Sequence, residues 1–229
     1  MRNLEVIVGI KDAVPIVLGY LPLGFAFGVL ATEAGMTILQ ATLMSVLCFS
    51  GAGQYIAIGV MQAGGAIITA VIANLLVNLR YFLFSTSLVP LLKGVPTKIA
   101  AFLSYGLTDE TYAVSINRYQ SKKATASYMA GLNLTSHLGW IASTLLGALL
   151  GSLITNTDKI GLGFALPAMY VCLLVLLVAN RNEAIVAAIA GIVCLTVGYI
   201  YPTTMANLSN IIIATLIAAT IGVLLSDKY

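Results

Sequence analysis

Charged residues are scarce in this sequence, and their scarcity excludes an ordinary soluble domain. Only 8% of the 229 residues are charged, whereas 60% are hydrophobic and the mean hydropathy is +1.02. Apolar runs of about 20 residues, the length that spans the hydrocarbon core of a bilayer, recur along the chain. Because these runs are continuously apolar rather than alternating, a membrane β-barrel is excluded. The composition therefore predicts an all-α, polytopic membrane protein.

Cysteine and histidine are also rare. The 3 cysteines stand singly within apolar runs, with neither metal-ligand spacing nor a pattern of disulfide pairs. The net charge of +3 is slight and dispersed, and no basic run of four or more residues occurs, which argues against nucleic acid as a partner. We therefore expect no metal ion, no cofactor and no nucleic acid.

Eight apolar stretches, joined by short polar connections, are long enough to be membrane spans. None of the connections has room for a soluble domain, so we predict one integral membrane transporter domain over residues 1–229. The predicted spans are 13–32, 38–62, 65–92, 97–117, 124–153, 162–180, 184–201 and 207–225.

The basic residues of the connections predict the orientation, because cytoplasmic loops are richer in Lys and Arg. With eight spans and an inside N-terminus, seven such charges lie inside and three outside. If residues 38–62 were instead re-entrant, seven spans would remain and the ten charges would split five against five. The bias favours eight spans with both termini cytoplasmic. The inside residues are Arg2, Lys11, Arg118, Lys122, Lys123, Arg181 and Lys228, and the outside residues are Lys93, Lys98 and Lys159.

Two of the predicted spans contain features that interrupt helices. The first contains Pro22, with Gly24 and Gly28 close by, and proline removes a backbone hydrogen bond, so we expect a kink or unwinding there. The second has two glycines and two polar side chains within residues 49–54. Broken helices near the bilayer midplane commonly form solute sites in transporters. The alternative is close helix packing through small residues.

Three charged residues lie inside predicted spans: Arg80, Asp109 and Glu110. A charge at the bilayer centre costs roughly 2.5 to 3.5 kcal/mol, so such residues usually face a partner, a cavity or a permeation path. Arg80 follows Asn74 and Asn78, which are four residues apart and share one helical face. A guanidinium binds a carboxylate through two parallel bonds, which favours an anchor for a substrate carboxylate. The structural alternative is an ion pair with Asp109 or Glu110.

Asp109 and Glu110 are adjacent, so on a helix they point about 100 degrees apart and cannot both face one small site. One division has Asp109 facing the cavity, as an ammonium partner or proton carrier, while Glu110 contacts another helix or Arg80. Alternatively, the two carboxyl groups mark the end of a span near the interface.

His137 is the sole histidine, and it lies in the middle of a predicted span. It is either a proton relay or a hydrogen-bonded core residue. An intramembrane serine enzyme using Ser50 and His137 is conceivable chemically, but only the presence of the two residue types supports it. We therefore expect that the protein is not an enzyme.

Several motifs follow one another in a characteristic order. This order resembles the AzlC family, named for azaleucine resistance, over nearly the whole chain. Gly53 stands where the family pattern has alanine, and Tyr81 stands where a histidine is frequent. The motifs are Pro22-Leu23-Gly24 with Phe27-Gly28, Phe49 to Gln54, Asn78-Leu79-Arg80, Leu88-Val89-Pro90 and Thr108-Asp109-Glu110.

The resemblance implies the large subunit of a branched-chain amino acid exporter in the bacterial cytoplasmic membrane. Its implied substrates are leucine, isoleucine, valine and often methionine, its driving force is the proton motive force, and its partner is a small membrane subunit of the AzlD type. A passive channel for small solutes and a non-transporting assembly subunit are the alternatives.

Taken together, the residues and the resemblance predict a substrate site near the midplane. The carboxylate of the amino acid would bind Arg80 or the half-helix amides, its ammonium would bind Asp109, and its side chain would rest among Phe25, Phe27 and Phe49. The candidate substrate-binding residues are Ser50, Gly51, Gly53, Gln54, Asn78, Arg80 and Asp109. The candidate proton-coupling residues are Asp109, Glu110 and His137, and the candidate helix-break residues are Pro22, Gly24 and Gly28.

Overall fold

The computed structural model describes residues 2–62, 64–154, 161, 164, 167–168, 171, 174–175, 178, 180–203 and 209–226. The elements assigned within these residues are helices, which confirms the predicted all-α membrane bundle. Contacts divide the chain into two compact units, Met1–Leu166 and Pro167–Tyr229. The single domain over residues 1–229 stays a prediction, and the span predicted at 162–180 falls mostly outside the described residues.

Two long helices, α1 (Arg2–Glu33) and α7 (Ala126–Leu150), form the scaffold of the first unit. They run side by side in the same direction, because Val6 lies against Gly131 near one end and Val29 lies against Gly151 near the other. A Cβ atom at Gly131 would collide with the backbone of Val6. Small residues let helix backbones approach closely in membranes, so these glycines serve packing.

The unwinding predicted near Pro22 is wrong, because α1 continues through this residue without interruption. Pro22 lies on the exposed side of the helix, as does Leu18 one turn earlier, so the proline ring is away from α7. Gly24 and Gly28 do not loosen the helix either, since both press directly against the backbone and side chains of α7. Packing on the opposite side therefore keeps the helix continuous despite the missing hydrogen bond.

The break predicted within residues 49–54 is confirmed. Helix α2 (Ile38–Leu47) ends before this motif, and helix α3 (Gly51–Gln62) begins inside it. Residues 48–50 between the two helices are called tip 1, and the pair α2–α3 is called hairpin 1. Helices of 10 and 12 residues are about 15 and 18 Å long, roughly half of the hydrocarbon core.

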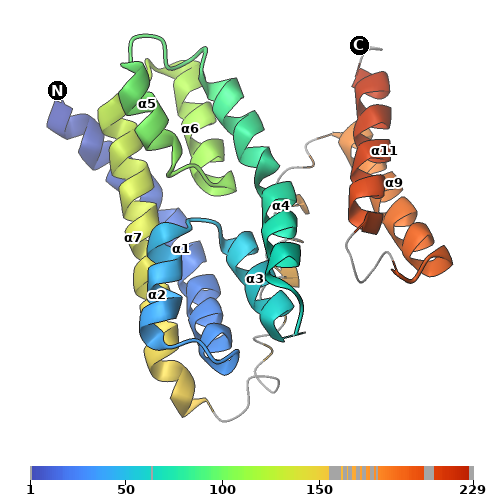
Figure 1. The fold of residues 1–229 in the computed structure, drawn as a ribbon. Helices are drawn as coiled ribbons and strands as arrows, with labels where there is room; N and C mark the ends of the chain where they lie inside the picture. Colours follow the sequence, from blue (N-terminus) through green and yellow to red (C-terminus); the bar gives the residue numbers. More distant parts are fainter. Residues whose placement is uncertain are drawn as a thin grey trace. The chain divides into compact units, whose positions relative to one another are not determined.

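Hairpin 1 turns back at tip 1 instead of crossing the unit in one line (Figure 1). Helix α2 runs opposite to α7, because Ile38 shares a pocket with Leu149 whereas Ser45 bonds to Thr144. Helix α3 then returns in the direction of α1, with its Tyr55 bonded to a carbonyl of that helix. Both ends of hairpin 1 are therefore at the end of the unit where α1 finishes.

A second hairpin enters the unit from the opposite end (Figure 1). Helix α4 (Ile67–Leu88) runs opposite to α1 and leads into α5 (Thr97–Ser104) and α6 (Asp109–Ser121). The pair α5–α6 is called hairpin 2, and residues 105–110, which connect its helices and include the first two residues of α6, are called tip 2. Helix α6 runs opposite to α1, because its start bonds to Tyr20 and its end bonds to Glu5.

The segment α4–α5–α6 thus repeats α1–α2–α3 in inverted direction: a long helix followed by a hairpin that reaches halfway. Hairpin 1 corresponds to the re-entrant alternative for residues 38–62, and residues 97–121 also turn back instead of crossing. Hydropathy reports length and apolarity but not direction, so two half-length helices in sequence resemble one span. This inversion is the arrangement of repeats found in many secondary transporters.

The basic residues of the described connections in the first unit lie at one end. The described connections at the other end, 34–37 and 64–66, contain neither Lys nor Arg. One ion pair joins hairpin 2 to α1 at the basic end, with Arg118 Nη2 2.9 Å from Glu5 Oε2. The basic residues of this end are Lys93 and Lys98 of the α4–α5 region and Arg118, Lys122 and Lys123 at the end of α6.

Three described helices are long and apolar enough to cross a membrane: Leu4–Glu33 within α1, Ile67–Leu88 and Arg181–Ile200. Helix α7 has 25 residues, which gives a length of about 37 Å, and it too exceeds the bilayer core. It is less apolar because it buries polar side chains, among them Asn133 and Ser143. Those side chains face the interior of the first unit.

The second unit contains two long described helices, α9 (Arg181–Ile200) and α11 (Ser209–Ser226). They pack in opposite directions, since Gly222 lies beside Val186 whereas Asn210 Nδ2 lies 3.5 Å from Cys194 Sγ. The side chain of Asn180 caps the start of α9. Both helices are apolar throughout most of their length, as expected of membrane spans.

Candidate functional site

The ends of the two hairpins meet within the first unit. Tyr105 of tip 2 donates its hydroxyl hydrogen to the backbone oxygen of Val46, at the end of α2, over 3.0 Å. Helices α3 and α6 both begin beside this junction, so their N-terminal amides and positive dipole ends lie close to it. This is the place in the fold where the charges predicted at membrane depth come together.

Tip 2 presents two carboxyl groups to different helices. Thr108 caps α6, because its Oγ1 accepts from the backbone N–H of Thr111 at 3.2 Å. In turn, the backbone N–H of Thr108 donates to Thr111 Oγ1 at 2.8 Å. Asp109 and Glu110 follow directly, and their side chains diverge: Asp109 reaches α4, whereas Glu110 reaches α1. The prediction that adjacent carboxyl groups contact different partners is therefore confirmed.

Asp109 forms an ion pair with Arg80 of α4, with 3.0 Å between Asp109 Oδ2 and Arg80 Nη1. The Asp109 side chain is only 8% exposed and that of Arg80 is 24% exposed, so the pair is largely removed from solvent. The guanidinium also lies 5.3 Å from the ring centre of Tyr81. The second carboxylate oxygen, Asp109 Oδ1, is buried and has no hydrogen-bond partner among the described residues.

Glu110 has a neutral partner. The hydroxyl of Tyr20 donates to Glu110 Oε2 at 2.7 Å, and the same hydroxyl lies 2.7 Å from Thr108 Oγ1. Tyr20 was not among the residues that the sequence suggested. A tyrosine in a run of prolines, glycines and leucines gives no signal by itself, because a buried tyrosine is commonly a packing residue.

Tip 1 offers neutral polar groups to α4. Ser50 Oγ donates to Asn78 Oδ1 at 2.7 Å, and Asn74 Nδ2 donates to the backbone oxygen of Gly53 at 3.0 Å. Glycine is required at position 53, because a Cβ atom there would collide with the side chain of Asn74. Gly51 is similarly confined, with only 2.9 Å between a built Cβ and the ring of Trp140. The predicted residues of tip 1 and α4 are thus brought together.

Gln54 points away from this junction. Its side chain is fully buried, accepts from Trp140 Nε1 at 2.8 Å and donates to Ser45 Oγ at 2.9 Å. Ser45 in turn bonds to Thr144 of α7. Both ends of the amide are therefore occupied by bonds that fix hairpin 1 against α7, and the structure places Gln54 in a packing network rather than beside Arg80.

His137 also lies on the α7 side of tip 1. Its Nε2 is 2.9 Å from the backbone oxygen of Ser45, and its ring stacks on Phe49 with 4.4 Å between centres. It lines a cavity of about 250 Å³ between α5 and α7, together with Asn133 and Tyr105. The predicted proton-coupling residues therefore lie in two places: Asp109 and Glu110 are at tip 2, whereas His137 is on α7 and stacks on Phe49 of tip 1.

Aromatic rings fill the space between the tips and the scaffold. Tyr20 packs edge-on against both Phe49 and Trp140, and Phe27 packs against Trp140 and Tyr55. Phe27 and Phe49 are both buried, as expected for the predicted apolar part of the site. The backbone of Phe25 lies instead against Gly147 of α7, and residues two apart on a helix do not face the same way.

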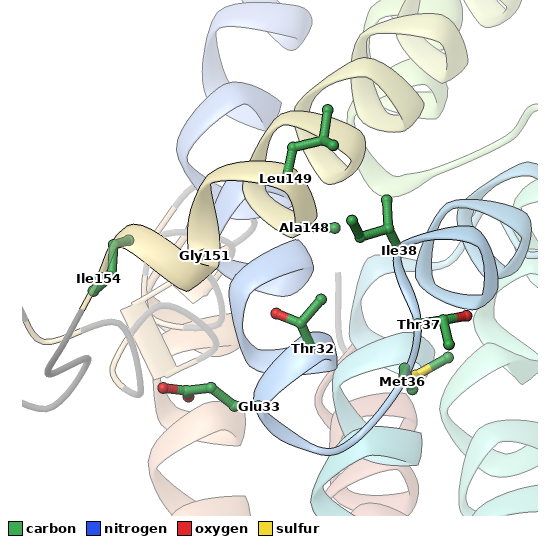
Figure 2. Close-up of a pocket in the computed structure, with 9 residues that line it drawn as sticks. All are labelled: Thr32, Glu33, Met36, Thr37, Ile38, Ala148, Leu149, Gly151 and Ile154. Carbon is green, nitrogen blue, oxygen red and sulfur yellow. The ribbon is translucent and has the colours of Figure 1, made fainter.

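A larger cavity, of about 590 Å³, opens at the end of the unit opposite the basic residues (Figure 2). It is formed where α1 ends, α2 begins and α7 finishes, and Thr32, Glu33 and Thr37 supply its polar side chains. Among the described residues, no group of three or more His, Cys, Asp or Glu side chains lies together as a metal site would require.

Comparison with known proteins identifies relatives among bacterial and archaeal membrane proteins. Residues 15–154 match the family described as AzlC protein, and this range contains both hairpins. An uncharacterized membrane protein of Archaeoglobus fulgidus is 36% identical over 186 residues, or 80% of each chain. The inner membrane protein YgaZ of Escherichia coli is 28% identical over 195 residues, again 80% of each chain.

A further relative has a name that states a function. The branched-chain amino acid transport protein AzlC of Bacillus subtilis is 27% identical over 166 residues, which are 71% of this chain and 63% of that protein. No solved structure matches the chain.

Proposed function

The chain belongs to the AzlC family, and on this premise we propose that it is a secondary transporter exporting branched-chain and other hydrophobic amino acids from the cytoplasm. The observation that carries this proposal is the buried ion pair between Arg80 and Asp109 where the two tips meet. The name of the Bacillus subtilis relative, a branched-chain amino acid transport protein, supports the substrate class. Leucine, isoleucine, valine and methionine are the proposed substrates.

An amino acid carries the same two charges as the pair between Arg80 and Asp109. In our proposal the substrate carboxylate binds the guanidinium through two parallel bonds, and the ammonium binds Asp109. The buried Asp109 Oδ1, without a hydrogen-bond partner among the described residues, offers the ammonium an additional acceptor. Arg80 exchanges the carboxylate of Asp109 for that of the substrate, and Asp109 exchanges the guanidinium for the substrate ammonium. Opening the pair therefore leaves no buried charge without a partner.

The neutral groups of tip 1 complete the proposed site. Ser50, Asn78 and the first amides of α3 lie on the α4 side of the junction, where the carboxylate would approach. Phe49, at the same tip, would contact the aliphatic side chain. The inverted repeat supports alternating access, since in such repeats one element rocks against the rest of the protein around a fixed site.

The distribution of basic residues supports an orientation for export. With both hairpins re-entrant and the other spans as predicted, nine of the ten loop and terminal charges fall on one side, against seven in the eight-span arrangement. We propose that this side is cytoplasmic, with both termini in the cytoplasm and the protein in a bacterial cytoplasmic membrane. A small subunit of the AzlD type and the proton motive force complete the proposal.

Efflux from bacteria that lack their own exporters tests this function. Cells loaded with dipeptides of valine, leucine, isoleucine or methionine would express the chain alone or with its small partner. We expect uphill efflux that an uncoupler abolishes and that the variant Asp109→Asn lacks. Flux that never runs uphill would indicate a passive channel instead, and absence of efflux from well-inserted protein with its partner would indicate an assembly subunit.

A further inference from the structure

One residue of α1 touches both hairpin tips. Tyr20 is 5% exposed, and its ring packs edge-on against Phe49 of tip 1 with 6.0 Å between centres. Its hydroxyl contacts tip 2, where it donates to Glu110 and lies within hydrogen-bond distance of Thr108. A single side chain of the scaffold therefore contacts both tips, and one of its contacts is a hydrogen bond whose acceptor, Glu110, is ionisable.

The hydroxyl groups around Glu110 form a directed chain. Tyr20 has one hydroxyl hydrogen and gives it to Glu110 Oε2, so the bond between Thr108 and Tyr20 must take its hydrogen from Thr108. The chain runs from Thr108 through Tyr20 to the carboxylate. When the carboxylate is ionised, the final bond is charge-assisted and about twice as strong as a neutral one.

Protonation of Glu110 reverses this chain. A neutral carboxylic acid is a donor, so Glu110 then donates to Tyr20, and Tyr20 donates to Thr108. The charge-assisted bond is replaced by a neutral one, and Thr108, the cap of α6, changes from donor to acceptor toward α1. Tip 2 is therefore held more weakly against the scaffold when Glu110 carries a proton.

The groups around Glu110 distinguish it from its neighbour. The titratable residues that face Glu110 are Tyr20 on α1 and Asp109 on α6 itself, and these two face Arg80 and Tyr81 on α4. Asp109 is in direct contact with the guanidinium, and in the proposed function it exchanges that guanidinium for the ammonium of the substrate. A proton on Asp109 would remove this attraction, so the coupling proton needs a different carrier.

We propose that Glu110 is the proton-carrying carboxyl of the transporter and that Tyr20 transmits its protonation to the two tips. This inference rests on the proposed function, because it assigns the proton of an exporter to one side chain. A proton arriving from the outer side binds Glu110 Oε2, weakens the hold of Tyr20 on tip 2 and allows hairpin 2 to move. The same proton leaves to the cytoplasm, and the ionised carboxylate then receives the Tyr20 hydrogen again.

Infrared difference spectroscopy of the purified chain tests the carrier without requiring transport. Lowering the pH should protonate several of the 8 Asp and Glu side chains, and one of the resulting C=O stretching bands, that of Glu110, should be present in the wild-type protein and in Asp109→Asn. The band should disappear in Glu110→Gln and should shift in Tyr20→Phe, which loses only the hydroxyl. A band that persists in Glu110→Gln and vanishes in Asp109→Asn would overturn the assignment.

Transport by reconstituted protein, with its small partner present, tests the coupling. Tyr20→Phe should lower leucine transport driven by a pH gradient about tenfold, as the loss of one charge-assisted hydrogen bond implies, while gradient-free leucine exchange stays close to wild type. Combining it with Glu110→Gln should add no further loss. An undiminished effect of Tyr20→Phe in the Glu110→Gln background would contradict the role of Tyr20.

Tyr55→Phe is the matched control. Tyr55 is as buried as Tyr20, but its hydroxyl donates to the backbone oxygen of Leu23, a neutral acceptor, at 2.8 Å. Its removal should leave the pH dependence of transport unchanged. If the wild-type protein itself shows no gradient-driven transport while the infrared band behaves as expected, the proposed function fails and the protonation site stands.

Discussion

Tip 1 and tip 2 share one backbone design and differ in their chemistry. Each joins two half-length helices, and the helix after each tip begins with a hydroxyl residue, Ser50 or Thr108, that accepts a hydrogen bond from the third residue beyond it. Tip 1 is surrounded by amides, hydroxyls and rings, whereas tip 2 carries two carboxyl groups, one against Arg80 and one against Tyr20.

This difference indicates that the two hairpins have different tasks. The bonds that Ser50 and Gly53 make to α4 join neutral groups, so a charged solute does not alter their strength greatly. The bonds of tip 2 involve charged groups, and in our proposals a zwitterionic solute competes for Asp109 while a proton neutralises Glu110. Hairpin 2 is therefore the element expected to respond to both ligands, and hairpin 1 is the element expected to stay fixed against α7.

Removing Arg80, the α4 cation that pairs with Asp109, should have the largest effect. Arg80→Ala leaves Asp109 buried without its partner, and breaking a buried ion pair in this way costs about 3 to 5 kcal/mol. Thermal unfolding in detergent and leucine binding should both show the loss. Arg80→Lys, which keeps the charge but not the two-pronged geometry, should recover stability more than it recovers binding. Wild-type binding by Arg80→Ala would make the pair purely structural.

Adding a side chain at Gly53, in the first turn of α3 after tip 1, should also lower the stability of the protein, but without changing any charge. In Gly53→Ala the added Cβ collides with Asn74, and overpacking of this kind costs about 1 to 3 kcal/mol. The control is Gly59→Ala in the same helix, where a Cβ meets no atom within 4 Å and helix propensity favours alanine by about 1 kcal/mol. Gly53→Ala should lower the unfolding temperature and Gly59→Ala should raise it. Equal shifts in the two variants would contradict the tight packing around Gly53.

The two capping residues provide the most direct comparison of the tips. Ser50→Ala and Thr108→Ala should each cost about 1 kcal/mol of stability, as the loss of a helix cap does. Only Thr108→Ala should also change the pH dependence of leucine transport, because only Thr108 belongs to the chain that ends at Glu110. A similar change in Ser50→Ala would remove the distinction between the tips.

The smallest effect is expected where hairpin 2 meets α1 at the basic end. Glu5 and Arg118 are 2.9 Å apart, but the Glu5 side chain is 32% exposed, so the pair should contribute about 1 kcal/mol or less. Glu5→Gln should therefore lower the unfolding temperature slightly, and added salt should reduce the difference from wild type. A loss as large as that of Arg80→Ala would show that hairpin 2 is held mainly at its base.

The sequence identified the chemistry of the site better than its topology. Arg80, Asp109 and Glu110 could be found because charge is rare in an apolar chain, and the break at residues 49–54 could be found because glycines and polar residues replace bulk there. The turn-back of hairpin 1 could be stated only as an alternative, and that of hairpin 2 was missed, since hydropathy has no direction. The partners of each carboxyl group depend on that turn-back, which brings residues 20 and 80 beside residues 108–110.

Two residues were misjudged or missed for separate physical reasons. Pro22 suggested a break, but its position on the exposed side of α1, with Gly24 and Gly28 packed on the other, keeps the helix continuous. Tyr20 gave no signal, because its role comes from the position of its hydroxyl between the tips and not from its residue type.

The central claim is that a zwitterion takes the place of the pair between Arg80 and Asp109, and competition with halves of the substrate tests it most directly. Labelled leucine bound to the purified protein would be challenged with unlabelled leucine, with 4-methylpentanoate, which has only the carboxylate, and with isoamylamine, which has only the ammonium. The account predicts displacement by leucine alone at comparable concentrations, because either half leaves one buried charge unpaired. Displacement by either half as effectively as by leucine would contradict it.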